Sequence, residues 1–205
     1  MFTTTTDSGT KEVLDVVWRM AYIAEYREGS NTGHLERIRH YSNVIARGMG
    51  LPMKEVQIIS IASQLHDIGK IGLSEALLLK QGDYTSTELE IIKRHTIIGS
   101  DILRDSNSVF LQAGECIALN HHERWDGSGY PNSLNGDQIP LSARIVALSD
   151  VFDALTTSRP YKKEIPIGDA RQLIIEAGGL LFDPQIVSIF DENFNEFSKP
   201  KRSQK

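Results

Sequence analysis

The sequence predicts a single all-α domain built as a helical bundle, and three observations support this prediction. Apolar residues recur at intervals of three and four along most of the 205-residue chain, the spacing of helices that pack against a core. No segment shows the alternation of a half-buried strand, and no internal repeat is present. Hydrophobic residues make up 40% of the chain and charged residues 24%, so one domain can bury a substantial core.

The first three helices are expected at residues 11–27, 34–49 and 53–67. The first carries a stripe of apolar side chains at helical spacing, and turn-forming residues separate it from the second. The third is apolar over a wide arc, so we expect it to lie near the centre of the bundle.

Two helices are expected in the middle of the chain, each with histidine at one end. Residues 87–90, Thr-Glu-Leu-Glu, are interpreted as a capping box before the helix that carries His95. The next helix is expected to begin at Asn107 or Ser108 and to run to His121-His122.

The last third of the chain predicts a long loop followed by three helices. Residues 125–137 are dense in glycine, proline, asparagine and aspartate, which is typical of a loop. Helices are expected at 141–157, 167–177 and 184–197. Asp183 is a good N-cap for the last of them, and the proline after it suits a first helical turn.

Charge and composition exclude several classes of protein. A net charge of −5 argues against non-specific nucleic-acid binding, and no apolar run approaches the roughly 20 residues of a membrane helix. The start of the chain lacks the features of a secretory signal. Cys116 is the only cysteine, which fits a cytoplasmic protein with a buried structural thiol. The domain is expected at 11–197, after a disordered segment 1–10 and before a basic tail 198–205.

Five of the six histidines lie where helices can bring them to one centre. They are His34, His66, His95, His121 and His122. A single such histidine is more often a core or surface residue, as we expect for His40, so the combination carries the argument. Adjacent residues diverge by about 100° on a helix, but near helix ends both can face a cleft. Mixed imidazole and carboxylate ligands favour iron, manganese, nickel or zinc over calcium.

Six stretches of sequence together resemble one known family. They are HDIGK at 66–70, His95, HHERWDGSGYP at 121–131, IPLSARI at 139–145, DVFDALT at 150–156 and RPYK at 159–162. The set resembles the HD-GYP domain of the HD superfamily over about residues 22–195. The resemblance implies a helical bundle with a GYP loop. It also implies a phosphodiesterase that hydrolyses cyclic di-GMP to linear pGpG, and on to GMP if both phosphodiester bonds are cut.

The resemblance also implies a bimetallic centre. One metal ion is then held by His34, His66, Asp67 and Asp150. Asp67 bridges to a second ion held by His95, His121 and His122. The implied cofactors are two divalent transition-metal ions, iron or manganese, and a hydroxide between them attacks phosphorus in line with the leaving 3′ oxygen.

Catalysis is assigned by the same resemblance to Asp67 and Lys70, with Lys70 near the scissile phosphate. Arg159 and Lys162 match positions that hold substrate phosphates, although a solvated surface position is a plausible alternative for Lys162. Tyr130 is interpreted as a wall of the substrate pocket. Its loop could instead dock a diguanylate cyclase or simply brace the site.

Asp153 follows Asp150 by three residues, so both lie on one helical face. We interpret Asp153 as a residue that orients a ligand histidine or a bound water. The alternative is an ordinary surface or capping carboxylate.

The sequence departs from the family before the first histidine. Many relatives carry an acidic residue there that binds a third metal in some members, and Ser30 occupies that position in an ungapped alignment. A serine hydroxyl is a poor substitute for a carboxylate, and Glu28 is the nearest acid. We therefore expect two metals, with pGpG as the product.

Several alternatives stay open at this level. No residue reads the base, so the substrate could be another cyclic dinucleotide or a nucleotide phosphoester. The domain could also be a weakly active signalling effector that binds nucleotide or a cyclase. The helix at 11–27 could be the end of a linker, part of the bundle or a segment that forms a homodimer.

Overall fold

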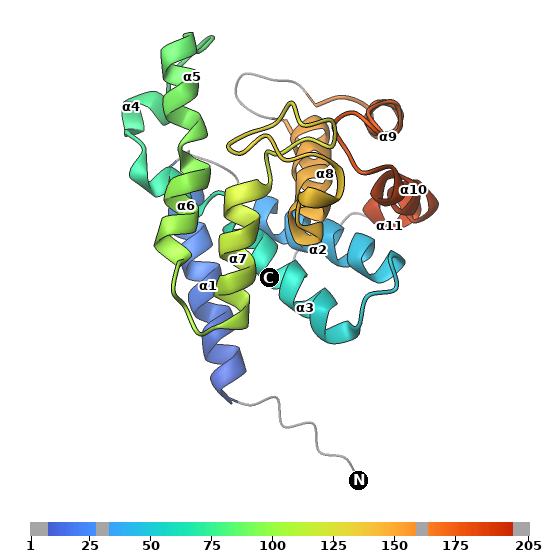
Figure 1. Cartoon of the computed structure of the whole chain (residues 1–205), viewed down its shortest axis with the longest axis horizontal. Coiled ribbons are helices and arrows are strands. Elements are labelled where there is room, and N and C mark those ends of the chain that lie inside the picture. The colour runs from blue at the N-terminus through green and yellow to red at the C-terminus, as the bar shows by residue number, and fades with distance from the viewer. Residues whose placement is uncertain (1–7, 28–32, 159–163, 199–205) are drawn as a thin grey trace.

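The computed structural model describes residues 8–27, 33–158 and 164–198, and the regular secondary-structure elements within them are all helices (Figure 1). The α-helices are α1 (Ser8–Tyr26), α2 (Gly33–Gly48), α3 (Met53–Ala62), α4 (Glu75–Leu78), α5 (Ser86–Lys93), α6 (His95–Leu103), α7 (Val109–Asn120), α8 (Leu141–Thr156), α9 (Ile167–Glu176), α10 (Pro184–Glu192) and α11 (Phe194–Phe197). Three 3₁₀ helices are η1 (Ser63–Leu65), η2 (Ile68–Gly72) and η3 (Gly136–Gln138). The described residues contain no strand, only an isolated bridge between Gly178 and Phe182. The all-α prediction is confirmed.

The core has two main parts on either side of α2. Helices α2, α3, α8, α9 and α10 enclose an aromatic cluster that includes Tyr41, Phe152 and Phe190. Helices α1, α6 and α7 enclose the other part, which includes Val17 and Leu103. Figure 1 shows α1, α6 and α7 side by side on one side of the bundle and α8 to α11 on the other. The metal-ligand candidates come from both halves, so the site forms only when the bundle closes.

Two helix boundaries differ from prediction at the chain's ends. Helix α1 begins at Ser8, so the last residues of the segment expected to be disordered already belong to it. The helix predicted at 184–197 divides at Asn193, whose backbone (φ −103°, ψ 14°) is not helical. Most of residues 1–10 and 198–205 lies outside the described residues.

The capping box prediction was displaced by two residues. The sequence contains two overlapping Thr-x-x-Glu patterns, and the protein uses Thr85 with Glu88. The Glu88 backbone N–H donates to Thr85 Oγ1 at 3.3 Å, and the Thr85 N–H donates to the Glu88 carboxylate at 2.8 Å. Glu90 instead accepts from Lys93 at 2.6 Å. The box starts α5, and α6, which carries His95, follows directly after Arg94.

Candidate metal centre

The helix predicted at 53–67 ends early, and the break in it allows the adjacent side chains of His66 and Asp67 to face the same centre. Helix α3 stops at Ala62, and η1 tightens the chain over the next three residues. Asp67 then takes a non-helical conformation (φ −102°, ψ 10°) before η2 begins. His66 and Asp67 therefore do not diverge as neighbours within a regular helix do. His121 occupies the equivalent position at the C-terminal end of α7.

Gly69 allows η2 to contact the start of α6. A Cβ on Gly69 would lie 1.9 Å from the carbonyl oxygen of His95 and 2.4 Å from the backbone nitrogen of Gly99. No side chain fits there, so glycine is required for this approach of the two backbones. The approach places Asp67 beside His95.

The structure brings all seven predicted ligands into two adjacent groups. In each group, one possible ligand atom per residue lies within 4.8 Å of the others. The first group is His34, His66 and Asp150, and the second is Asp67, His95, His121 and His122. The groups combine residues of α2, α6, α7 and α8 with the segment between η1 and η2.

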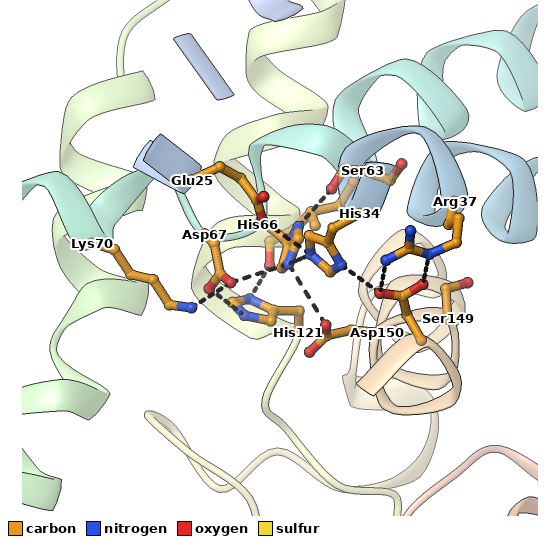
Figure 2. Close-up of polar contacts among 12 residues, drawn as sticks. Glu25, His34, Arg37, Ser63, His66, Asp67, Lys70, His121, Ser149 and Asp150 are labelled. Atoms are coloured by element: carbon orange, nitrogen blue, oxygen red, sulfur yellow. Dashed lines mark hydrogen bonds and ion pairs between the residues drawn. The ribbon is translucent and has the colours of Figure 1, made fainter. Parts of the chain in front are cut away.

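Asp67 belongs to the second group but also contacts His66 of the first, and its two carboxylate oxygens face different histidines (Figure 2). Its Oδ2 is 3.2 Å from His66 Nε2, whereas its Oδ1 is 3.3 Å from His95 Nε2 and 3.7 Å from His121 Nε2. Asp67 Oδ1 is buried and accepts no hydrogen bond from the described residues. A buried carboxylate oxygen in this state is costly unless a cation binds it. The donor set therefore fits two cations that share Asp67.

Four of the histidines have one ring nitrogen hydrogen-bonded to a protein oxygen, so the other ring nitrogen is available to bind a cation at the centre. The Nδ1 atoms of His66, His95 and His121 lie 2.9, 2.7 and 3.1 Å from the backbone oxygens of Ser63, Ile92 and Ile117. A carbonyl oxygen only accepts, so Nδ1 carries the proton and Nε2 presents its lone pair inward. His34 has the same arrangement, with Nδ1 2.7 Å from Asp153 Oδ2.

Asp153 itself is held by a residue that the sequence analysis did not single out. Arg37 donates from Nη2 to Asp153 Oδ2 at 3.0 Å, and its Nε donates to Oδ1. Burial alone would raise the pKa of Asp153, but the contacts with His34 and Arg37 outweigh burial and lower it. Arg37 follows His34 by three residues on α2, and that spacing is the only signal of its role in the sequence.

Charge and burial around the centre favour the metal-binding forms of Asp67, His95 and His122, whereas His66 favours its protonated form. Burial would raise the pKa of Asp67, but Lys70 and His66 outweigh it and hold that pKa well below its usual range. Burial lowers the pKa of His95 to about 4 and that of His122 well below its ordinary value. For His66, burial lowers the pKa, but Asp67 and Asp150 outweigh it and raise the pKa to about 9. This pKa applies to His66 in the absence of a cation. A cation that binds His66 would displace the proton.

Lys70 lies at the edge of the centre, and α1 fixes its backbone. Its Nζ is 2.7 Å from Asp67 Oδ2. Arg27, at the end of α1, donates to the carbonyl oxygens of Lys70 at 3.3 Å and of Leu73 at 2.9 Å, and also to that of Ile71. Arg27 thus caps η2, a role that sequence spacing could not reveal because 43 residues separate it from Lys70.

The loop after His122 is tied to the centre by Tyr130 and Glu123. The Tyr130 ring stacks on His122 with centroids 4.8 Å apart, and Lys93 Nζ lies 5.4 Å from the Tyr130 centroid. Glu123 is 3% exposed and accepts from the backbone nitrogens of Asn132 at 2.7 Å and Leu134 at 3.0 Å. Tyr130 is therefore held beside His122, one of the predicted ligands.

The other residues singled out in the sequence either lie in parts of the chain that the structure does not describe or contact other elements. Arg159, Lys162, Ser30 and Glu28 lie outside the described residues. His40 is turned away from the centre, with Nε2 3.0 Å from the Glu196 backbone oxygen.

Glu25 is a further acidic residue at the centre that the sequence analysis did not propose. It is 7% exposed, and its Oε1 lies 3.5 Å from His34 Nε2.

The buried cluster of imidazoles and carboxylates within a helical bundle is typical of proteins that bind divalent transition-metal cations. Comparison with known protein families identifies the family. A family model described as HD domain matches residues 19–186, so the chain belongs to this family, and its motifs are those of an HD-GYP domain. The resemblance seen in the sequence is confirmed.

Three known proteins illustrate the relationship. The chain is 47% identical over 169 residues to the cyclic di-GMP phosphodiesterase response regulator RpfG of Xanthomonas campestris pv. campestris, covering 82% of this chain and 45% of that protein. It is 38% identical over 183 residues to the 3′3′-cGAMP-specific phosphodiesterase 2 of Vibrio cholerae, and the match covers 89% of this chain and 35% of that protein. A crystal structure of the cyclic GMP-AMP specific phosphodiesterase V-cGAP3 of V. cholerae has a TM-score of 0.65 at 21% identity, over 89% of this chain and 48% of that one.

The chain spans about half or less of the length of the curated relatives it matches. Among the residues that the structure describes, no helix is long and apolar enough to cross a membrane. Family and ligand cluster together indicate a divalent-metal site.

Proposed function

We propose that this domain hydrolyses a phosphodiester bond of cyclic di-GMP in a reaction that requires two divalent cations. The observation that carries this proposal is the position of Asp67, whose two oxygens face two separate groups of histidines. Relatives named as cyclic di-GMP phosphodiesterases support the choice of substrate.

Two adjacent cations would lower the pKa of a bound water and neutralise charge on phosphoryl oxygens. The protein's own residues supply the rest. Asp153 fixes the tautomer of His34, and backbone oxygens fix those of His66, His95 and His121. Lys70 Nζ lies next to Asp67 Oδ2, where it can donate to a phosphoryl oxygen of the bound substrate.

Tyr130 forms one wall of the proposed substrate site. Its ring is half-buried and packs on His122, so its position is fixed relative to a ligand. Arg159 and Lys162 are proposed to bind the second phosphate from the segment that follows α8.

The metals are proposed to be iron or manganese: mixed imidazole and carboxylate ligands suit iron, manganese, nickel or zinc, and the resemblance to HD-GYP domains favours the first two. The product is proposed to be linear pGpG, and the reaction is placed in the cytoplasm, where the single cysteine stays reduced. Docking of a diguanylate cyclase on the loop 125–137 and formation of a homodimer stay predictions.

A second candidate substrate is 3′3′-cGAMP, which a relative 38% identical to this chain is named for. It has the same cyclic backbone with two 3′,5′-phosphodiesters, and the metal centre acts on phosphorus rather than on the base. The two substrates therefore differ only in contacts to one purine.

The test compares both substrates under anaerobic conditions with Mn²⁺ or Fe²⁺, and identifies the products by chromatography. We expect hydrolysis of cyclic di-GMP with pGpG accumulating, and no hydrolysis by an Asp67→Asn variant. The control is Asp101→Asn, which changes an exposed aspartate that pairs with Arg104. Faster turnover of 3′3′-cGAMP would favour the second candidate. Full metal loading without hydrolysis of either nucleotide would contradict the proposal and favour a binding effector.

A further inference from the structure

The end of α1 brings a buried carboxylate to the first ligand group. Glu25 lies one residue before the end of α1 and is 7% exposed. Its helix packs Val17, Ala21 and Ala24 into the apolar core, so Glu25 continues a buried face. Figure 2 shows its side chain directed towards His34 and His66. The end of α1 therefore places a buried carboxylate beside His34.

Glu25 lies next to Nε2 of His34, the ring nitrogen that faces the proposed metal centre. His34 Nδ1 is engaged by Asp153 at 2.7 Å, so Nε2 is the atom left to bind a cation. That nitrogen lies 3.5 Å from His66 Nε2 and 3.5 Å from Glu25 Oε1. Glu25 thus approaches His34 at the atom that the proposed metal uses.

The distance between Glu25 Oε1 and His34 Nε2 fits two ligands of one cation better than it fits a direct hydrogen bond. Ligand atoms bonded to one cation at about 2.1 Å stand roughly 3 to 4 Å apart, depending on geometry. A hydrogen bond between imidazole nitrogen and a carboxylate is about 2.7–2.9 Å when charge-assisted. The Glu25–His34 separation of 3.5 Å lies in the first range, as does the His34–His66 separation of 3.5 Å.

We propose that Glu25 is a metal ligand, binding the cation that is held by His34, His66 and Asp150. This inference rests on the proposed metal-dependent function. His34, His66 and Asp150 have ligand atoms within 4.8 Å of one another, and Glu25 is not part of that group, so its side chain would have to move inward from His34 Nε2 to bind the same cation. That cation would then have carboxylates from Glu25 and Asp150 and could share Asp67, whereas the second would have Asp67 and three imidazoles. The two cations then differ in their surroundings, and the oxygen-rich first site favours harder ions such as Mn²⁺.

The inference is tested by Glu25→Gln, with Glu12→Gln as the matched control on an exposed position of the same helix. Metal is removed, Mn²⁺ is titrated by calorimetry, and bound metal is counted by mass spectrometry after dialysis. The wild-type and Glu12→Gln proteins are expected to retain about two ions per chain. Glu25→Gln is expected to retain one, with affinity for the other reduced by at least about 100-fold.

Folding is measured in the same samples by circular dichroism in EDTA. If Glu25→Gln does not fold, Glu25→Asp replaces it, and the shorter carboxylate is expected to weaken the same ion by about 10-fold or more. Two ions bound with wild-type affinity by the folded variant would overturn the inference but leave the proposed function intact. Wild-type protein that binds no divalent ion would overturn the proposed function itself.

Discussion

His34 Nδ1 lies 2.7 Å from Asp153 Oδ2, and this contact turns the opposite ring nitrogen towards the metal centre. Arg37 holds the same carboxylate, so the orientation of His34 depends on a three-residue chain that links α2 and α8. We expect Asp153→Asn to lower affinity for the cation at His34 by about 10- to 100-fold, because the ring loses its charged partner.

Calorimetric titration with Mn²⁺ measures this loss, and the second ligand group is expected to keep its affinity. Asp191→Asn is the control, since Asp191 forms a surface ion pair with Arg171. Unchanged binding at both sites in Asp153→Asn would show that His34 needs no such support.

Lys70 is expected to act on the substrate rather than on the metals. Replacing it by methionine removes an ammonium 2.7 Å from Asp67 Oδ2 but no predicted ligand. We expect Lys70→Met to retain its metals and to lose about 100- to 1,000-fold in kcat, as for the loss of one charge-stabilising donor. Steady-state kinetics and metal analysis check this together, with Lys54→Met, at an exposed position of α3, as the control. Loss of metal from Lys70→Met would instead assign Lys70 to the support of Asp67.

Gly69 is expected to tolerate no side chain. Because an added Cβ would meet backbone atoms of His95 and Gly99, Gly69→Ala should destabilise the fold by at least about 3 kcal/mol. Thermal unfolding measures this change. Gly168→Ala is the control: its Cβ would meet nothing within 4 Å, and alanine favours the helix by up to about 1 kcal/mol. Equal stability of the two variants would mean that η2 can move away from α6 at little cost.

The start of α5 should depend on pH through Glu88. Hydrogen bonds from Lys80 and then from Thr85 lower its pKa from 4.5 to about 2. A lowered carboxyl pKa adds stability above the unfolded value, so the cap is intact above pH 4.5 and is lost as pH falls towards 2. Amide hydrogen exchange of α5 should therefore accelerate over this interval in the wild-type protein and not in Glu88→Gln. Equal pH dependence in both would exclude Glu88 as the cause.

The sequence predicted which residues lie together at the centre better than it predicted the residues that support them. His66, Asp67 and the histidines at 121 and 122 sit in long motifs, so their roles follow from a local pattern. Arg27 and Glu25 act through contacts that depend on how α1 packs, and no spacing along the chain encodes such contacts.

Helix ends were the other source of error, for a similar reason. The choice between two Thr-x-x-Glu patterns was decided by Lys80, whose ammonium lies 2.6 Å from Glu88. The early end of α3 at Ala62 interrupts an apolar pattern that continues to Leu65, so periodicity could not reveal it. At the start of α5, a contact from outside the helix therefore accompanies the pattern that is used.

Electron paramagnetic resonance of the protein loaded with two equivalents of Mn²⁺ tests the shared role of Asp67 most directly. Two ions bridged by one carboxylate lie about 3.5–4 Å apart and couple magnetically. We predict a coupled spectrum for the wild-type protein, and its loss in Asp67→Asn. A spectrum of isolated ions in the wild-type protein, with both sites filled, would contradict the bridged centre.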